Sequence, residues 1–342
     1  MTLWQQILII IAGSAALAAA LIPCVMPLLR RYALARPNAR SSHKQPTPQG
    51  GGAVIVLVVM LVFFGLGFLQ FEGWITGVMS YYSTLLIAAG VMALIGAVDD
   101  IRPLPAVVRL ILQTLLVTWV VATAPADWRL VPEVPMLLER AFCIFAGVWF
   151  VNLVNFMDGV DLMTVAEGVP VGAALAFAAC VGLLSLNGGI VAAALCGGLI
   201  GFALYNRHPA KLFLGDVGSL PIGLMLAALL FELAARTSIV AALLLPMYFL
   251  VDATGTVVLR WRAGENLFEA HRRHAYQNAV DGGWGVSRVI VWVLGLNLVL
   301  VMLACVATLA SLLEIRWLLG LTLAQGIATT LYVSRRFRAA LR

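Results

Sequence analysis

Long apolar stretches alternate with short polar segments along the whole chain. Each stretch holds roughly 20 mostly apolar residues, the length that a helix needs to cross a bilayer. The pattern predicts eleven spanning helices with the approximate bounds 3–29, 52–70, 82–98, 106–124, 136–152, 167–186, 189–205, 218–235, 238–259, 287–309 and 315–333. We therefore expect an all-α integral membrane protein, with residues 1–342 forming a single polytopic transmembrane domain.

The composition identifies the bilayer as the solvent for most of this chain. Hydrophobic residues make up 62% of it and charged residues only 11%, whereas roughly a quarter of the residues of a soluble domain are charged. The first apolar stretch is too long for a signal peptide and follows no basic segment, so we expect it to be retained as a span. The five cysteines lie apart and form no CxxC pair, which favours core residues over zinc ligands or disulfides.

Basic residues are distributed unevenly between the two sides that eleven spans define. One side holds the segments 30–51, 99–105, 153–166, 206–217 and 260–286 and the tail after 333. Eighteen of the 22 lysines and arginines fall on that side or just inside the adjoining span ends, and so do all four histidines. Positive residues mark the cytoplasmic side, so we expect these loops and the C-terminus to be cytoplasmic. The net charge of +6 is then a topology signal and does not indicate nucleic-acid binding.

Two adjacent carboxylates, Asp99 and Asp100, end the third predicted span. Neighbouring carboxylates at a membrane boundary repel each other and resist desolvation. A divalent cation or an acid–base role would explain them. The alternative is a solvated helix end beside the turn at Arg102 and Pro103.

A second polar group ends the fifth span, in the sequence VNLVNFMDGVD. If this segment is helical, Asn152, Asn155 and Asp158 form a polar stripe on one face. Buried amides and carboxylates need partners, and Gly159 permits a tight turn or a close backbone approach. Hydrogen bonding between helices is the alternative explanation.

The third group is NRHPAKLFLGDVGS, from Asn206 to Ser219, just before the eighth span. The start of that helix would offer unpaired N–H groups to a phosphate. Asp216 could hold a hard cation beside it, and Lys211 could meet phosphate as a point charge. A helix cap flanked by flexible glycines is the alternative.

Two basic segments complete the set on the same side. His271, Arg272, Arg273 and His274 lie together in a long loop, where adjacent arginines suit a diphosphate; positive-inside topology and lipid headgroup contact are the alternative. The first loop, RPNARSSHKQPTPQGGG, includes His43 and Lys44, whose basic character permits phosphate binding, although a plain linker is the default for such a composition.

Together these groups predict Mg²⁺-assisted phosphoryl chemistry on the cytoplasmic face. A membrane transporter is an alternative from another class, with Asp252 as the one acidic candidate deeper in a span. A structural subunit of a membrane complex is a third possibility.

The motifs PNARSSHKQPTPQGGG, GAVDD followed by RLILQ, NLVNFMDGVD, NRHPAKLFLGDVGS and HRRHAYQ occur in this order along the chain. In this combination the sequence resembles the polyprenyl-phosphate N-acetylhexosamine-1-phosphate transferases, the MraY/WecA superfamily of glycosyl transferase family 4. The resemblance covers nearly the whole chain, and HRRHAYQ looks closest to the WbpL-like branch.

The resemblance implies roles for individual residues. Asp216 matches the family's magnesium-binding aspartate, Asn155 is a second candidate metal ligand, and Asp99 and Asp100 match a pair proposed to bind metal or deprotonate the lipid phosphate. Phe213 matches an aromatic residue that stacks on uracil. The resemblance and the motifs together give these candidate substrate-binding positions: His43, Lys44, Arg109, Asn152, Asn155, Asp158, Gly159, Asn206, Lys211, Phe213, His271, Arg272, Arg273 and His274.

The implied reaction is transfer of N-acetylhexosamine-1-phosphate from a UDP-sugar, UDP-GlcNAc or a 6-deoxy relative, to undecaprenyl phosphate, with release of UMP. The resemblance implies a bacterial inner-membrane enzyme that initiates O-antigen or related polysaccharide synthesis and uses Mg²⁺, which Mn²⁺ could replace. Homodimerisation stays open.

The chain departs from the family pattern at two places. Ala35 stands where many relatives have Asp, and arginines interrupt the histidine run of the MraY branch. The second departure favours a small UDP-N-acetylhexosamine over the muramyl-pentapeptide substrate, which remains the alternative.

Overall fold

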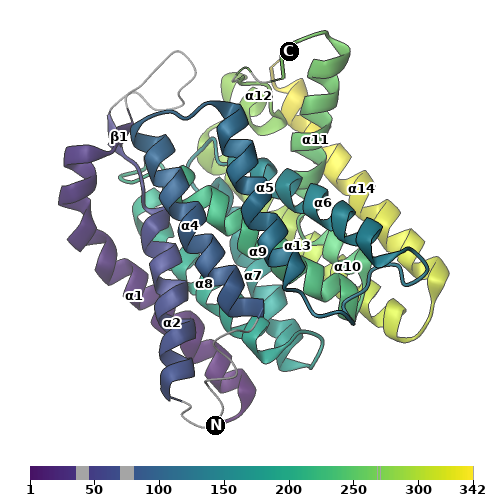
Figure 1. Cartoon of the computed structure of the whole chain (residues 1–342). Coiled ribbons are helices and arrows are strands. Elements are labelled where there is room, and N and C mark those ends of the chain that lie inside the picture. The colour runs from purple at the N-terminus through teal and green to yellow at the C-terminus, as the bar shows by residue number, and fades with distance from the viewer. Residues whose placement is uncertain (36–45, 70–80, 268, 270, 342) are drawn as a thin grey trace.

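The computed structural model describes the chain except residues 36–45, 70–80, 268, 270 and 342. The described part is almost entirely helical (Figure 1), which confirms the expected all-α membrane class. The helices are α1 (Leu3–Tyr32), α2 (Gly52–Leu69), α4 (Tyr81–Ile101), α5 (Ala106–Ala122), α6 (Met136–Met157), α7 (Met163–Cys180), α8 (Leu186–Asn206), α9 (Asp216–Arg236), α10 (Ile239–Leu244), α11 (Met247–Arg262), α12 (Ala275–Asp281), α13 (Val286–Leu312) and α14 (Arg316–Ala339).

Nine of the described helices are long and apolar enough to cross a membrane, and α5 is a shorter apolar helix of 17 residues. The remaining predicted span, 238–259, is not one continuous helix. It consists of α10 and α11, which are separated at Leu245 and Pro246. Proline lacks the N–H of an ordinary helical residue and its ring collides with the preceding turn, so the helix breaks there.

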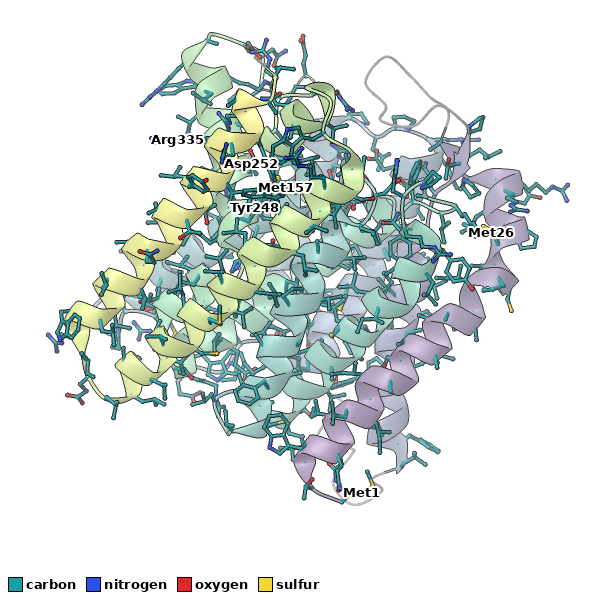
Figure 2. All side chains as sticks on the ribbon, turned by 180° about the vertical axis from the view of Figure 1, so that it is seen from behind. Met1, Met26, Met157, Tyr248, Asp252 and Arg335 are labelled. Atoms are coloured by element: carbon teal, nitrogen blue, oxygen red, sulfur yellow. The ribbon has the colours of Figure 1, made fainter. Side chains whose placement is uncertain are left out.

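The two termini lie at opposite ends of the bundle, as an odd number of crossings requires (Figure 1). The end that carries the C-terminus also carries α12 and a short hairpin of β1 (Leu34–Ala35) and β2 (Thr47–Pro48). Viewed from behind, Met1 lies at one end, and Arg335, Asp252 and Met157 lie toward the other (Figure 2). The loops that the sequence assigns to one side therefore gather at one end of the molecule.

Helices α8 and α9 form the centre of the bundle, where they are more deeply buried than the other long helices. Small residues explain the close packing of α8 against α1. A Cβ atom added at Gly197 would lie 2.3 Å from the carbonyl oxygen of Ile11, and one added at Gly201 would lie 2.4 Å from that of Ala15. Within a bilayer, helices associate through such close backbone contacts, so these glycines hold α1 against the centre.

Strand β2, at the end of the first loop, is hydrogen-bonded to the loop before α9. The backbone N–H of Phe213 donates to the carbonyl oxygen of Pro48 at 2.8 Å, and that of Gly52 donates to Leu214 at 3.0 Å. Gln49 and Phe213 form a parallel bridge. These bonds place residues 47–52 beside the segment that leads into α9, at the end of the bundle described next.

Candidate active site

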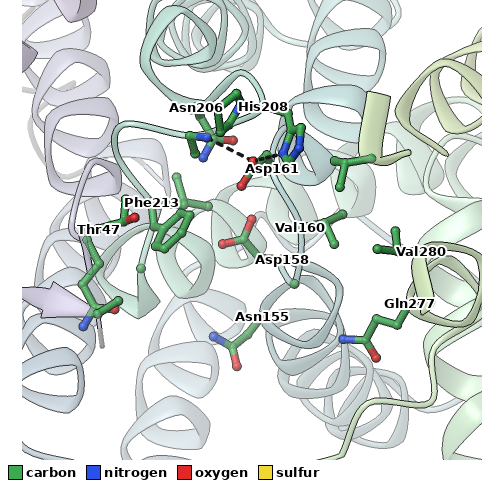
Figure 3. Close-up of a pocket in the computed structure, with 18 of the residues that line it drawn as sticks. Thr47, Asn155, Asp158, Val160, Asp161, Asn206, His208, Phe213, Gln277 and Val280 are labelled. Atoms are coloured by element: carbon green, nitrogen blue, oxygen red, sulfur yellow. Dashed lines mark hydrogen bonds and ion pairs between the residues drawn. The ribbon is translucent and has the colours of Figure 1, made fainter. Parts of the chain in front are cut away.

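A cavity of about 840 Å³ lies at this end of the bundle (Figure 3). Its walls come from the β1–β2 hairpin, the end of α4, the turn after α6, the loop before α9 and residues 277–286. The described polar residues that line it are Thr47, Gln49, Asp100, Asn155, Asp158, Asp161, Asn206, His208, Asp216 and Gln277. Five segments that are far apart in the sequence thus meet around one space.

The side chain of Asp100, near the end of α4, caps the N-terminus of α9. Its carboxylate accepts hydrogen bonds from the backbone N–H groups of Asp216 at 3.0 Å and Val217 at 3.2 Å. The next two N–H groups, of Gly218 and Ser219, donate to the carbonyl oxygen of Gly215. The expectation that this helix start offers unpaired N–H groups to a phosphate was therefore wrong. A carboxylate from another helix already satisfies them and matches the positive end of the helix dipole.

Two glycines allow this contact between α4 and α9. A Cβ atom added at Gly96 would lie 2.3 Å from the carbonyl oxygen of Asp216. Gly215 has a φ of +76°, and a Cβ atom there would lie 2.5 Å from the Asp100 carboxylate. Positive φ is a conformation that glycine adopts without steric cost, so the local geometry favours glycine at position 215.

The Asp216 carboxylate lies between an amide and a guanidinium group. Asn155 donates from Nδ2 to Asp216 Oδ1 at 2.7 Å and to the Ser219 hydroxyl at 2.9 Å. The nearest nitrogen of Arg109 lies 3.4 Å from Asp216 Oδ2 and also forms an ion pair with Asp99. The site predicted from separate motifs is in this respect one contiguous network.

The two adjacent acids, Asp99 and Asp100, have different surroundings. Asp100 lines the cavity, whereas Asp99 is absent from its lining and accepts hydrogen bonds from Arg109 and from the Leu104 backbone N–H at 2.6 Å. Asp99 thus anchors Arg109, and Asp100 both faces the cavity and caps α9.

The polar stripe predicted at the end of α6 is divided. The helix ends at Met157, so Asp158 lies in the following turn and does not continue the helical face. Asn155 and Asp158 line the cavity, but Asn152 does not. Instead, Asn152 donates to Gln113 Oε1 at 2.7 Å, a bond between helices α6 and α5. For Asn152 the alternative explanation, hydrogen bonding between helices, describes its contact.

Asp158 is the most strongly perturbed acid outside the spanning helices. Burial raises its pKa to about 7, and the negative charges of Asp100 and Asp161 act in the same direction. The Thr164 hydroxyl, which donates to this carboxylate, opposes the shift. Both protonation states are therefore populated near neutral pH, so Asp158 can donate or accept a hydrogen bond in the cavity.

Asp161 and His208 form a pair that the sequence did not predict, although Asp161 belongs to the second polar group and His208 to the third. His208 Nδ1 lies 2.6 Å from Asp161 Oδ2, and the same oxygen accepts the Ala210 backbone N–H at 3.1 Å (Figure 3). Both side chains line the cavity. They are separated by 47 positions, so no local pattern links them. The density of polar residues in NRHPAK was the only available signal.

Asn206 joins the same two loops. Its Oδ1 accepts the Leu162 backbone N–H at 2.7 Å, and its Nδ2 donates to the Leu212 carbonyl oxygen at 2.9 Å. Its side chain is buried at the cavity wall. Asn206 therefore fixes the turn after α6 against the loop before α9.

Phe213 and Lys211, predicted from the same loop, have different positions. The Phe213 ring lies in the cavity near Asp158, beside Thr47 (Figure 3). Lys211 is exposed and does not line the cavity.

The four residues His271 to His274 lie outside the cavity lining. Arg272 forms an ion pair with Asp281 at 2.8 Å, and Arg273 forms one with Glu265. The two histidine rings lie 5.0 Å apart. Both arginines are thus already paired with carboxylates in this structure.

The histidines of this segment are neutral near pH 7. Burial lowers the pKa of His271 to about 4, with contributions from His274 and Arg260. Burial likewise lowers the pKa of His274 to about 4, and the charges of Arg338 and Arg260 act in the same direction. Neutral imidazoles can donate one hydrogen bond each but add no positive charge.

The residues just after this segment reach the cavity instead. Gln277 and Val280 of α12, and Trp284 beyond it, form one wall (Figure 3). Sequence reasoning assigned the neighbouring histidines, gave Gln277 of the HRRHAYQ motif no role and missed Val280 and Trp284, because nothing in the sequence shows which turn of a short helix faces inward. His43 and Lys44 lie outside the described residues.

The charge of the cavity bears on metal binding. Of its described lining residues, Asp100, Asp158, Asp161 and Asp216 are acidic and none is lysine or arginine. Within the described ranges, no group of three or more His, Cys, Asp or Glu side chains forms a closed metal site. Mg²⁺ does not need one, because it is usually held by one or two carboxylates and completes its shell with water and substrate phosphates. Asp216 with the neighbouring Asn155 amide fits such an open site.

Comparison with known proteins adds independent information. Residues 82–234 match the model of glycosyl transferase family 4. A decaprenyl-phosphate N-acetylglucosaminephosphotransferase of Mycobacterium tuberculosis is 29% identical over 308 residues, which cover 79% of this chain and 74% of the relative. A phospho-N-acetylmuramoyl-pentapeptide-transferase of Carboxydothermus hydrogenoformans is 30% identical over 295 residues, which cover 78% and 86% of the two chains. One of Desulforudis audaxviator is 29% identical over 323 residues, covering 82% and 92%.

Proposed function

This chain belongs to glycosyl transferase family 4 and its MraY/WecA superfamily, and from that premise we propose that it transfers a sugar-1-phosphate from a UDP-sugar to a polyprenyl phosphate. The observation that carries the proposal is the acidic cavity around Asp216. Contacts with Asn155, Arg109 and Asp100 hold Asp216 in place. The relatives named above carry two different sugar-phosphate transferase names, and both names include a phosphate transfer.

The nucleotide part of the donor fits the side of the cavity formed by Phe213 and the turn at Asp158. An aromatic ring offers a stacking surface for uracil, an interaction of roughly 1–3 kcal/mol per base. Asp158 can accept from the base N–H when ionised or donate to a base carbonyl when protonated. The buried Asn206 keeps both loops in register.

The diphosphate fits beside Asp216. When bound there by Asp216 and the Asn155 amide, Mg²⁺ would supply charge neutralisation for the diphosphate and for the departing UMP. Arg109 contributes a fixed positive charge next to the same carboxylate. Asp99 keeps that guanidinium from leaving the network, because it accepts from the nitrogen atom that also approaches Asp216.

The attacking group is an oxygen of the polyprenyl phosphate, which displaces UMP from the β-phosphorus of the donor. A phosphate monoester has its second pKa near 6, so it is largely a dianion at pH 7 and no protein base is needed to activate it. Asp99 and Asp100 both accept hydrogen bonds already, which favours direct attack over an aspartyl-phosphate intermediate. Holding the two substrates in line supplies most of the catalysis in such a reaction.

We propose an N-acetylhexosamine as the sugar, with UDP-GlcNAc or a 6-deoxy relative as donor and undecaprenyl phosphate as acceptor. The arginines within the histidine segment argue against a muramyl-pentapeptide donor. The product would start O-antigen or a related polysaccharide. The asymmetry of basic residues favours a multi-pass protein of the bacterial inner membrane with the cavity on the cytoplasmic side.

A donor panel tests this proposal. The purified protein is incubated with radiolabelled UDP-GlcNAc, a 6-deoxy UDP-sugar or UDP-MurNAc-pentapeptide, each with undecaprenyl phosphate and Mg²⁺. We expect label in the lipid fraction and stoichiometric UMP with one of the small UDP-sugars. Transfer only from the muramyl-pentapeptide donor would overturn the choice of sugar, and no transfer from any donor would overturn the reaction.

A further inference from the structure

Asp252 is a buried carboxylate that the proposed reaction does not use. It belongs to α11 and is fully buried. It lies near Tyr248, toward the end of the bundle that carries the C-terminus (Figure 2). A lone acid in a spanning segment is costly and usually has a function. The sequence singled it out as a transport candidate, so the identity of its partners decides what it does.

The partners of Asp252 come from three helices. Both carboxylate oxygens accept the backbone N–H of Ala275, the first residue of α12, at 2.9 and 3.1 Å. The hydroxyls of Tyr248 and Thr256 donate to it from one turn before and one turn after, each at 3.3 Å. Arg338, near the end of α14, lies 3.7 Å away. The carboxylate is thus hydrogen-bonded to groups of the protein itself, so a role in transport is not needed to explain why it is buried.

The contact with Ala275 matters because α12 forms a wall of the cavity. Gln277 and Val280 of this helix line it. The hydroxyl of Tyr276 donates to the Phe156 carbonyl oxygen at 3.3 Å, beside the turn that carries Asp158. A Cβ atom added at Gly159 would lie 2.2 Å from the same hydroxyl. The position of α12 therefore sets the position of the turn at which we place the nucleotide.

Helix α12 has only seven residues and needs contacts with other parts of the protein to stay in position. Isolated helices of this length are unstable in water, so α12 depends on external contacts. The end of α14 provides some of them: Phe337 packs edge-to-face on Trp284, and a Cβ atom added at Gly282 would lie 2.0 Å from the Ala340 carbonyl oxygen. Asp252 provides the contact at the other end of α12, where the backbone N–H groups need an acceptor.

We infer that Asp252 is a positioning residue: by capping α12 it fixes the wall of Gln277 and Val280 against the Asp158–Gly159 turn and so sets the affinity for the UDP-sugar. The inference rests on the proposed function for the identity of the ligand. Asp252 touches no substrate in this account. Its loss should therefore weaken binding of the nucleotide much more than it slows the chemical step.

The test removes the Asp252–Ala275 bond from each side in turn. Asp252→Ala deletes the acceptor. Ala275→Pro deletes the donor, and proline is accepted at the first position of a helix. The preceding residue, His274, already has the extended conformation that a following proline requires. The two variants share the loss of the Ala275 hydrogen bond, whereas Asp252→Ala alone also removes the contacts with Tyr248, Thr256 and Arg338.

Glu232 offers a matched control at the opposite end of the bundle. It is also fully buried and accepts a backbone N–H, that of Ser185 at 2.8 Å, at the start of α8. Glu232→Ala thus removes a buried acidic cap of the same kind, far from α12. It measures the effect of general destabilisation.

Two readouts are taken on the full-length protein in detergent. Hydrogen exchange of peptides covering residues 275–281 reports the position of α12 without any substrate. Steady-state kinetics give KM for the UDP-sugar and kcat. We expect both α12 variants to exchange faster and to raise KM about tenfold with kcat within about threefold, while Glu232→Ala leaves both readouts near wild type. The double variant should be no worse than Asp252→Ala alone, because Asp252→Ala already removes the Ala275 bond that Ala275→Pro removes.

Unchanged α12 exchange and unchanged KM in Ala275→Pro would overturn the inference, even if Asp252→Ala fails to accumulate. Equal effects of Glu232→Ala would also overturn it, because they would show a general loss of stability. Exchange needs no substrate, so faster exchange in the α12 variants together with no transfer by the wild type would refute the proposed function and leave the capping role intact.

Discussion

The contact between Asp100 and α9 gives the sharpest prediction about the cavity. The two backbone N–H groups that Asp100 accepts belong to Asp216 and Val217, at 3.0 and 3.2 Å. Replacing Asp100 by alanine leaves both donors without their partner. It also frees the first turn of α9, which carries the Asp216 carboxylate. The variant should therefore lose stability and activity together.

The size of the effect follows from the two bonds. A hydrogen bond to a charged acceptor contributes about 1.5–3 kcal/mol, so two give an upper limit of about 3–6 kcal/mol. The cavity admits water, which replaces part of each bond, and measured losses of single helix caps are about 0.5–2 kcal/mol. We therefore expect Asp100→Ala to cost about 2–4 kcal/mol of unfolding free energy and to reduce kcat more than about 100-fold.

Asp100→Asn distinguishes a cap from a base. Asparagine keeps one acceptor oxygen, so as a cap it should retain part of the stability and lose only about tenfold in kcat. A general base would behave differently, because an amide cannot take up a proton. The assay compares thermal unfolding in detergent with UMP release for both variants. Asparagine with wild-type stability and no turnover would refute the capping explanation.

Three further predictions concern the same end of the molecule. Arg109→Lys should keep more turnover than Arg109→Met, since lysine retains the positive charge beside Asp99 and Asp216; equal UMP release by the two variants would show that this charge is not needed. Gly159→Ala should cost about 1–3 kcal/mol by overpacking against the Tyr276 hydroxyl, and Tyr276→Phe in the same chain should restore part of the lost thermal stability. The pKa of His274 is lowered to about 4 in the folded protein and is about 6.5 in the unfolded chain. The contribution of the neutral side chain to stability is therefore complete above pH 6.5. As the pH falls toward 4, the free energy of unfolding decreases by about 1.4 kcal/mol per pH unit. His274→Gln should flatten the fall in thermal midpoint over that range, and parallel curves would contradict this.

The spanning helices were the most predictable part of the structure. Hydropathy alone located the nine described helices that are long enough to cross a membrane and the shorter α5, because the bilayer requires an apolar stretch for each crossing. It gave no reason to divide the stretch 238–259, although Pro246 marks the break. A proline within a spanning segment is often tolerated, as Pro221 is within α9, so its presence does not decide between a kink and a break.

Part of the site was predictable residue by residue, because several predicted side chains line the cavity and others, such as Asn152 and Lys211, do not; its internal contacts were not predictable. Asp100 and Asp216 were both identified from local motifs, yet the hydrogen bonds between them join residues 116 positions apart. The same holds for the pair of Asp161 and His208. Local sequence patterns report periodicity and capping, whereas these contacts depend on how α4, α7 and α9 pack. The part that could not be predicted is therefore the tertiary geometry.

Asn152 is a residue that the sequence pattern predicted for the site but that does not line the cavity. Its spacing from Asn155 suggested a shared face, but α6 turns it toward Gln113 of α5. Side chains three positions apart on a helix point about 60° away from each other around its axis, so one can face the cavity while the other faces a neighbouring helix. The direction in which a helix faces is set by its neighbours.

The most direct test of the central claim is Mg²⁺-dependent UMP release by wild type and Asp216→Asn in the same lipid vesicles, with undecaprenyl phosphate and the UDP-sugar chosen by the donor panel. We predict that the wild type releases UMP only when Mg²⁺ is added, and that Asp216→Asn inserts normally and releases almost none at any Mg²⁺ concentration. UMP release by Asp216→Asn at the wild-type rate, with the same dependence on Mg²⁺, would contradict the assignment of this cavity as the catalytic centre.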